Sequence, residues 1–179
     1  MNSNFNYMGK VTLKTMCKDK VICTQHFNSG SDTLFKAYAL AMSGQDVSHY
    51  LPTYINIGEY IPQTEKFTSM LQNETGVSVV RTYVEDSKGH CTRITITLTN
   101  NMFKTSATDM DENSVIQIRL LSGRTEEDSS ILATLNLADI DDDDIQNKTD
   151  FLNTISTTPT GTQLIIVWDL YITNKEVAS

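Results

Sequence analysis

The sequence contains few cysteines and prolines, and it has no long apolar run. Its three cysteines, Cys17, Cys23 and Cys91, are too few and odd in number for the disulfide framework of a small secreted domain. We therefore expect reduced thiols. The longest apolar run is far below the roughly 18 residues of a membrane span, and residues 1–10 lack the basic start and apolar core of a signal peptide. These absences predict a protein that is made and kept in a cytoplasm, without a membrane partner.

Positive charge is also scarce. The chain carries 14 Lys and Arg residues against 22 Asp and Glu residues, which gives a formal net charge of −8 at pH 7. Binding to nucleic-acid phosphates needs clustered Lys and Arg, and the sequence contains no dense basic segment. The charge balance therefore disfavours nucleic acid as the main partner.

The residues that are frequent favour strands over helices. Val, Ile and Thr are common, and long stretches of Ala, Leu, Glu and Lys are missing. About eight apolar segments, most of them alternating with polar residues, are separated by turn residues, which is the pattern of an antiparallel β-sandwich. A chain of 179 residues fits one domain with one hydrophobic core. We predict an all-β sandwich over residues 1–179, with one helix near residues 32–43.

The segment Gln163–Thr173 is predicted to be a central strand. Its apolar residues occupy both faces over its first half, so it needs cover on two sides. One face carries Leu164, Ile166, Trp168, Leu170 and Ile172. Trp168 is the only tryptophan, and its ring buries a large apolar area. We expect the other face, with Ile165, Val167 and Tyr171, to be covered by the chain's own second layer, whereas exposure there would indicate an assembly surface.

Seven further segments are predicted to be strands. They are Lys10–Lys18, Lys20–His26, Pro52–Pro62, Val77–Val84, His90–Thr99, Ser114–Leu121 and Ile131–Leu137. The first two form an expected hairpin, and Asp86–Gly89 is the expected turn of a second hairpin. Three long loops are predicted, and loops of this length are common docking sites for partners. They are Gln63–Gly76, with a helical turn near Lys66–Leu71, then Asn100–Glu112, which contains little to bury, and Asp139–Gly161.

One helix is predicted over Thr33–Ser43. Ser31 or Asp32 is a suitable N-cap, and Gly44 fits the C′ position. Apolar residues recur at helical spacing, which predicts that this stripe packs on the edge or end of the sandwich, with a surface for a partner as the alternative. The stripe consists of Leu34, Phe35, Tyr38, Ala41 and Met42.

The acidic run Asp139–Asp144 is a weak calcium candidate. Asp139, Asp141 and Asp143 fall at the first three ligand positions of a calcium-loop register, but Asp144 stands where the sharp turn needs Gly, and no helix pair flanks the run. The favoured interpretation is a solvated acidic loop, which can also meet a basic patch on a partner.

Soft metal ligands occur in two places in the sequence. They are Cys17, Cys23 and His26, and then His90 and Cys91. The spacing of the first two cysteines lacks the tight knuckle of a zinc finger, and thiols on alternating strands are more often small buried side chains. The sequence therefore predicts no metal site here.

No catalytic signature is present. The sequence has no Gly-x-Ser-x-Gly elbow and no glycine-rich loop before a helix. Glu59, Glu65 and Glu74 could be imagined as carboxylates for glycan cleavage, but nothing in their spacing selects them. We expect a protein that is not an enzyme and that has no cofactor, with a small hydrolase of unrecognised type as the third alternative.

A combination of segments resembles a known class of proteins. The N-terminal strand pair is followed by a helix ending in Ser43-Gly44, a proline-led strand, the strand Ile131–Leu137, an acidic spacer, and the terminal pattern Leu-x-Ile-x-Trp-x-Leu over residues 164–170. This resembles small virion structural proteins of tailed bacteriophages, of the podovirus and crAss-like types. The resemblance implies a β-sandwich present in multiple copies at the tail, collar, fibre attachment or capsid surface, whose activity is binding to neighbouring chains.

The resulting functional prediction is a non-enzymatic structural component of a phage virion. Its expected partners are copies of itself and other virion proteins, and it is assembled in the host cytoplasm. The alternatives are a capsid-surface decoration or head-fibre protein, or a carbohydrate- or receptor-binding module. In such a module, exposed tyrosines would stack on sugars, and the candidates are Tyr50, Tyr54, Tyr60 and Tyr83.

Overall fold

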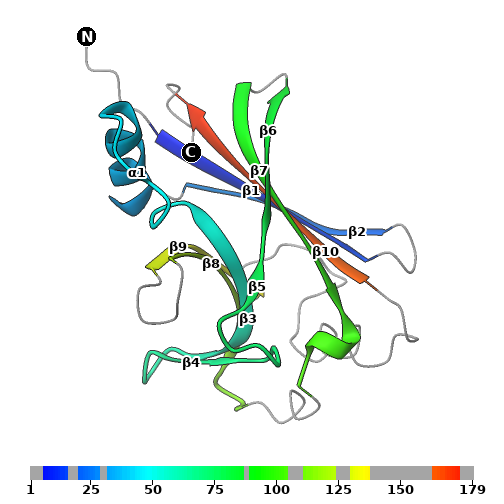
Figure 1. Cartoon of the computed structure of the whole chain (residues 1–179). Coiled ribbons are helices and arrows are strands. Elements are labelled where there is room, and N and C mark those ends of the chain that lie inside the picture. Colours follow the sequence, from blue (N-terminus) through cyan, green and yellow to red (C-terminus); the bar gives the residue numbers. More distant parts are fainter. Residues whose placement is uncertain are drawn as a thin grey trace.

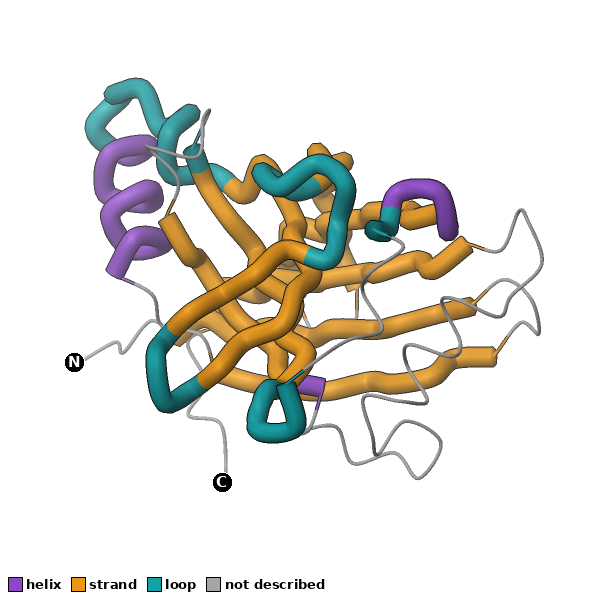
Figure 2. Tube along the Cα trace, turned by 90° about the horizontal axis from the view of Figure 1, so that it is seen from below, coloured by secondary structure: helices purple, strands orange, loops and turns teal. Residues whose placement is uncertain are grey.

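Two antiparallel β-sheets pack face to face, and one helix lies at one end of the sandwich (Figures 1 and 2). The computed structural model describes residues 6–15, 20–28, 32–86, 89–104, 111–123, 130–137 and 163–173. The predicted all-β sandwich with a single α-helix is confirmed. The described residues contain ten strand segments instead of about eight, because two short strands were not expected.

Sheet A has the strand order β2-β1-β10-β7-β6. β1 (Asn6–Thr15) and β2 (Lys20–Asn28) form the predicted N-terminal hairpin, and β6 (Val80–Asp86) and β7 (Gly89–Thr99) form the second one. β10 (Gln163–Thr173) pairs with β1 on one side and β7 on the other. Its predicted central position is therefore confirmed.

Sheet B has the strand order β4-β3-β8-β9, with β5 also paired to β3. Its strands are β3 (Pro52–Ile61), β4 (Lys66–Ser69), β5 (Val77–Ser78), β8 (Val115–Ser122) and β9 (Ser130–Asn136). The three long strands correspond to predicted ones. All pairings within this sheet are antiparallel.

Two predictions about the chain after β3 are wrong. The segment Lys66–Leu71 contains no helical turn, because residues 66–69 pair with the end of β3 as strand β4. The single strand Val77–Val84 is divided at Val79, whose N–H donates to the carbonyl of Thr53. The chain leaves sheet B after β5 and enters sheet A as β6, a change of sheet of the kind that forms the corners of sandwiches.

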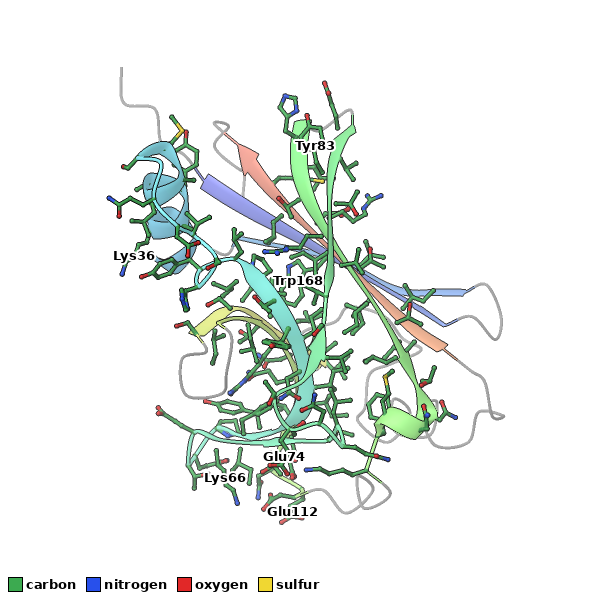
Figure 3. All side chains as sticks on the ribbon, in the orientation of Figure 1. Lys36, Lys66, Glu74, Tyr83, Glu112 and Trp168 are labelled. Carbon is green, nitrogen blue, oxygen red and sulfur yellow. The ribbon has the colours of Figure 1, made fainter. Side chains whose placement is uncertain are left out.

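The hydrophobic core lies between the two sheets. Trp168 on β10 is fully buried, and it stands directly opposite Ile94 of β7 in the strand register. Figure 3 shows its side chain between the layers. The other fully buried large side chains in the described ranges come from both sheets and from the loop after β4, and they are Ile55, Ile57, Leu71, Ile94, Leu98, Ile116, Ile118, Leu120, Leu132 and Ile166.

The second face of β10 is covered unevenly. Tyr171 and Asp169 are buried, whereas Ile165 and Val167 are half-buried. The second face is therefore buried toward the C-terminal half of the strand and half-buried toward its start. The core between the sheets contains Leu164, Ile166, Trp168 and Leu170 from the opposite face, so the second layer is not the cover that was predicted here.

Helix α1 (Asp32–Met42) ends as predicted, but three residues of its predicted apolar stripe are exposed. Gly44 has φ of 70°, and the N–H groups of Gly44 and Gln45 donate to the carbonyls of Ala41 and Leu40, which forms a Schellman cap. Met42 is 72% exposed. Tyr38 and Ala41 are exposed as well, so the predicted burial of the stripe is wrong at these three positions.

Among residues 36–42 of α1, the buried one is Ala37, and the helix contacts β9. A small residue lets a helix approach its neighbour closely, so the contact does not need the larger side chains. The predicted cap residue Ser31 lies outside the described residues. The structure also does not describe the side chains of Leu34 and Phe35.

The segment after β7 also differs from its prediction. A 3-10 turn, η1 (Asn100–Met102), leads into Phe103, which forms an isolated bridge with Leu71. Phe103 is buried, and Met102 packs against the core. The prediction that this loop contains little to bury is therefore wrong at its start.

Candidate functional site

The predicted metal candidates do not form a site in the described part of the chain. Asp139, Asp141 and Asp143 lie outside the described residues, as does Cys17. In the described ranges, no group of three or more His, Cys, Asp or Glu side chains could hold a metal ion. Cys91 is a buried free thiol.

Sheet order also separates the two groups of soft ligands. Cys23 and His26 are on β2, whereas His90 and Cys91 are on β7, with β1 and β10 between them. Three strand spacings amount to about 14 Å, which is too far for one zinc ion. His90 and Cys91 are adjacent on a strand and point to opposite faces.

The three glutamates weighed as catalytic carboxylates have separate local settings. The Glu59 carboxylate accepts a hydrogen bond from the N–H of Asp111 at 2.6 Å. Glu65 lies in the turn between β3 and β4, with φ of 54°. Glu74 accepts from Nζ of Lys104 at 2.7 Å, and this contact lowers the pKa of Glu74.

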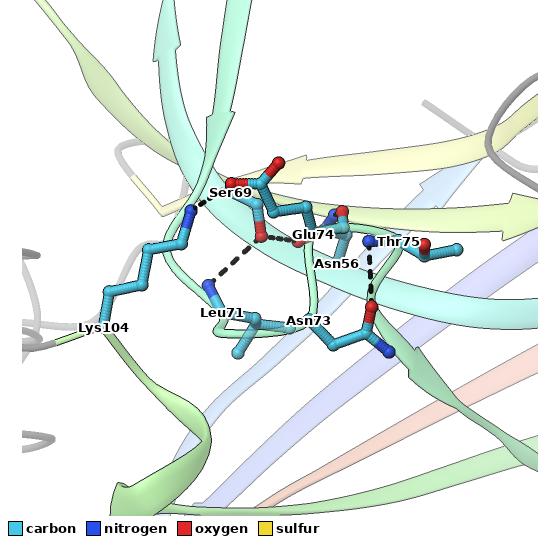
Figure 4. A network of polar contacts seen from close by, with 7 residues as sticks. All are labelled: Asn56, Ser69, Leu71, Asn73, Glu74, Thr75 and Lys104. Carbon is cyan, nitrogen blue, oxygen red and sulfur yellow. Dashed lines mark hydrogen bonds and ion pairs between the residues drawn. The ribbon is translucent and has the colours of Figure 1, made fainter.

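A buried polar network holds the loop that contains Glu74 against β3 (Figure 4). The hydroxyl of Ser69 donates to Oδ1 of Asn56 at 2.7 Å, and Nδ2 of Asn56 donates to the carbonyl of Glu74 at 2.6 Å. The N–H of Leu71 donates to the same hydroxyl at 3.1 Å. Asn56 and Ser69 are both buried, so each polar group has a partner inside the protein. The network is therefore a structural feature that fixes the loop.

The outer face of sheet B carries a different group, the Arg119 cluster. Its members are Tyr60, Phe67, Gln117, Arg119 and Asn136. The Arg119 guanidinium lies 3.9 Å from the centroid of the Phe67 ring and 5.4 Å from that of Tyr60. Its Nε donates to Oε1 of Gln117 at 2.6 Å, and Nε2 of Gln117 donates to Oδ1 of Asn136 at 2.9 Å.

Gly58 makes this stacking possible. Gly58 of β3 stands opposite Gln117 of β8, so any side chain there would project onto the outer face. A Cβ atom at Gly58 would lie 2.6 Å from the Phe67 ring and 2.3 Å from the carbonyl oxygen of Thr68. Only glycine allows the ring to lie flat over this part of β3.

The charge of Arg119 is only partly compensated. The side chain is half-buried, and burial lowers its pKa. In the described part of the chain it forms no ion pair with a carboxylate, and its hydrogen bond uses Nε alone. The two Nη groups therefore remain as planar donors beside two aromatic rings, an arrangement suited to carboxylates and to sugar hydroxyls.

The free edge of sheet A is the second candidate surface. β6 pairs with β7 on one side, and no described strand pairs with its other side. We call residues Val80–Asp86 the β6 edge. Val80 is 65% exposed and Tyr83 is 67% exposed, the largest exposed apolar side chains of sheet A in the described ranges. In Figure 1 the β6–β7 hairpin extends beyond the start of β3.

Tyr83 is oriented by its neighbours on the hairpin. Its ring stacks on His90, with centroids 6.0 Å apart, and its hydroxyl lies 2.7 Å from Nδ1 of His90. Partial desolvation and the carboxylate of Glu85 raise the pKa of Tyr83. The tyrosine is therefore neutral at physiological pH and presents an ordered aromatic face.

No protein-family model, curated protein or solved structure matches this chain. The two surfaces are therefore interpreted from their own geometry. Within the described ranges, no helix is long and apolar enough to span a bilayer.

The tyrosines named from the sequence have different settings. Tyr83 lies on the β6 edge and Tyr60 belongs to the Arg119 cluster. Tyr50 lies under Nζ of Lys36, which is 4.8 Å from its ring centroid, and Tyr54 is half-buried on β3. Arg119 and Gln117 were not predicted as site residues from the sequence. Polar residues such as these also alternate with apolar ones on any strand that has one face in solvent.

Proposed function

We propose that this chain is a non-enzymatic structural component of a bacteriophage virion that assembles in multiple copies at the tail, collar or fibre attachment. The observation that carries the proposal is the β6 edge, whose outer side pairs with no described strand and whose Val80 and Tyr83 side chains are exposed on opposite faces of the strand. The resemblance of the sequence to small virion proteins supplies the setting.

The β6 edge lacks several of the features that block strand addition in monomeric proteins. Such edges are often short, bulged, or interrupted by Pro or Lys. β6 contains no Pro and no Lys, and its register against β7 runs without a shift from Val80 to Asp86. Its charged residues Arg81, Glu85 and Asp86 disfavour an apolar partner strand, whereas a strand with complementary charges can pair with them. An extended, regular edge can accept a further strand, which is a common way for proteins to bind one another.

Mass spectrometry of purified phage particles tests the proposal. We expect the chain in particles of the phage that encodes it, at a stoichiometry of several copies. Separate measurement of tails and heads distinguishes a tail position from a capsid-surface or head-fibre position. Absence of the chain from washed, intact particles would overturn the proposal.

A second candidate function is a carbohydrate-binding module, and the Arg119 cluster favours it. Tyr60 and Phe67 supply aromatic rings, and Arg119 and Asn136 supply polar groups on the same sheet face. Flat aromatic surfaces bordered by planar donors suit sugar rings.

A glycan array that contains neutral and carboxylate-bearing glycans tests this candidate. We expect Tyr60→Ala and Arg119→Gln to abolish any signal, and Tyr50→Ala to leave it unchanged, because Tyr50 is not part of the cluster. A signal that none of these variants alters would remove the cluster as a sugar site, and an empty array would remove the candidate.

A further inference from the structure

We propose that two copies of this chain pair antiparallel through their β6 edges, about a two-fold axis at Tyr83. This inference rests on the proposed assembly function, and it specifies the contact through which two copies first associate. Such pairing would join two five-stranded sheets into one continuous sheet. The partner is a second copy of the chain because the edge is complementary to itself in charge.

The side chains of the β6 edge divide into two faces. Alternate residues of a strand point to opposite sides, so Arg81, Tyr83 and Glu85 share one face. Arg81 stands opposite Ile94 of β7 in the register, so this face is the one that continues from the core. Arg81, Tyr83 and Glu85 are nevertheless all exposed.

Symmetry limits how two such strands can pair. A two-fold axis that joins antiparallel edges into one sheet is perpendicular to the sheet, so each face maps onto itself. Directly opposed residues must then lie on the same face, so only registers centred on a residue are allowed. The candidates near the middle of the strand are Thr82, Tyr83 and Val84.

The register centred on Tyr83 has two advantages over the registers centred on Thr82 and Val84. It aligns the whole strand, with Val80 opposite Asp86 of the second copy and Thr82 opposite Val84. It also places Arg81 of each copy opposite Glu85 of the other, which gives two pairs of opposite charge. A centre at Thr82 sets Arg81 against Tyr83, and a centre at Val84 sets Tyr83 against Glu85, so neither forms these pairs.

The groups needed for this contact are free to make it. In the described part of the chain, Arg81 forms no ion pair, and the only contact of the Glu85 carboxylate is with the Tyr83 hydroxyl at 3.5 Å. Tyr83 sits on the proposed axis, where its ring meets that of the second copy. Cross-strand aromatic pairs and opposite charges both favour antiparallel pairing.

Charge reversal tests the register directly. Arg81→Glu and Glu85→Arg each turn both cross-strand pairs into like-charged pairs, so each should weaken dimerisation roughly tenfold or more. The double variant R81E/E85R restores opposite charges and should recover the wild-type dissociation constant. A mixture of the two single variants should form heterodimers. Sedimentation velocity over a concentration series measures all four.

Matched controls separate the register from net charge. Lys66→Glu and Glu112→Arg change the charge by the same amounts at exposed positions outside the β6 edge (Figure 3), and dimerisation should be unchanged. Circular dichroism and thermal melting of each variant confirm folding.

The possible failures are distinguishable. A wild-type chain that stays monomeric at millimolar concentration overturns self-pairing, and detection in particles by mass spectrometry still decides the proposed function independently. A dimer that both single reversals leave intact overturns this register. A dimer weakened by the singles and not restored by the double variant overturns the reciprocal charge pairs.

Discussion

Arg93 of β7 donates two parallel hydrogen bonds to the carboxylate of Asp169 on β10, from Nε at 2.7 Å and from Nη2 at 2.9 Å. The two residues are directly opposed in the strand register. The Asp169 side chain is 7% exposed, whereas that of Arg93 is 40% exposed. The pair thus neutralises a buried charge at the centre of sheet A, and these hydrogen bonds raise the pKa of Arg93.

Removing the arginine should destabilise the fold. Arg93→Ala leaves the buried Asp169 carboxylate without its cation, and we expect a loss of about 2–3 kcal/mol, less than for a wholly buried pair because solvent reaches this position. Arg93→Lys keeps the charge and loses the bidentate geometry, so its cost should be intermediate.

Urea denaturation followed by the fluorescence of the single tryptophan measures this loss. Lys66→Ala is the control, because Lys66 is an exposed cation on β4, outside the proposed dimer contact, and its loss should change stability by no more than about 0.5 kcal/mol. Equal effects of the two alanine variants would show that the ion pair contributes nothing specific.

A side chain at Gly58 should disrupt the outer face of sheet B. In Gly58→Ala the new methyl group would meet the backbone carbonyl of Thr68, which cannot move without breaking the β3–β4 pairing. We expect a loss of about 1–3 kcal/mol, typical of overpacking. Gly44→Ala is a useful comparison, since nothing lies within 4 Å of its Cβ position and its cost comes from positive φ alone.

The double variant Gly58→Ala/Phe67→Ala tests the cause. Shortening Phe67 removes the clash with the ring, while the clash with the carbonyl remains. The penalty of Gly58→Ala should therefore persist in the Phe67→Ala background. Its disappearance would mean that ring displacement accounts for the whole effect. The measurement is again the free energy of unfolding in urea.

Most of the strand framework is predictable from the sequence, because long segments such as Gln163–Thr173 and His90–Thr99 alternate or are apolar throughout. Short elements are not. β4 has four residues, too few to show a periodic pattern. Val77–Val84 contains valine on both sides of Val79, so its composition does not show that the chain changes sheet there.

The candidate surfaces depend on strand order, which the sequence does not encode locally. Phe67 and Arg119 are far apart in the chain and meet only because β4 and β8 flank β3. Tyr83 could be named as an exposed aromatic, but its position on a free edge follows from β6 being the last strand of sheet A. The predicted burial of Tyr38 and Met42 is wrong for a similar reason, since Ala37 is buried where α1 contacts β9 and these two larger residues are exposed.

The ion pair between Glu74 and Lys104 should make a small contribution to stability that depends on pH. The pKa of Glu74 is lowered in the folded protein, first by its hydrogen bond to Lys104 and then by the positive charge. The stabilising contribution is therefore fully present above the unfolded pKa of about 4.5 and is lost as pH falls through the folded value.

Comparison with Glu74→Gln reveals this contribution. Wild type should be slightly more stable than the variant at neutral pH, with the difference vanishing in acid and shrinking at high salt, because the pair is exposed. Glu112→Gln, at another exposed glutamate, removes the same charge without removing a described ion pair, so its effect on stability at neutral pH should be smaller. Thermal melts between pH 3 and 7 measure both, and a Glu74→Gln difference that grows in acid would contradict the assignment.

Trp168 should be the most costly single side chain to shorten in sheet A. It is fully buried and faces Ile94 across the ladder, so Trp168→Ala leaves a large cavity and should cost about 3–5 kcal/mol. Trp168→Phe retains a ring and should lose clearly less. Because the variants lack the fluorescent probe, circular dichroism in urea is the measurement. Met42→Ala, at an exposed position of α1, should cost less than about 0.5 kcal/mol. If Trp168→Ala matched this control, Trp168 would not be the centre of the core.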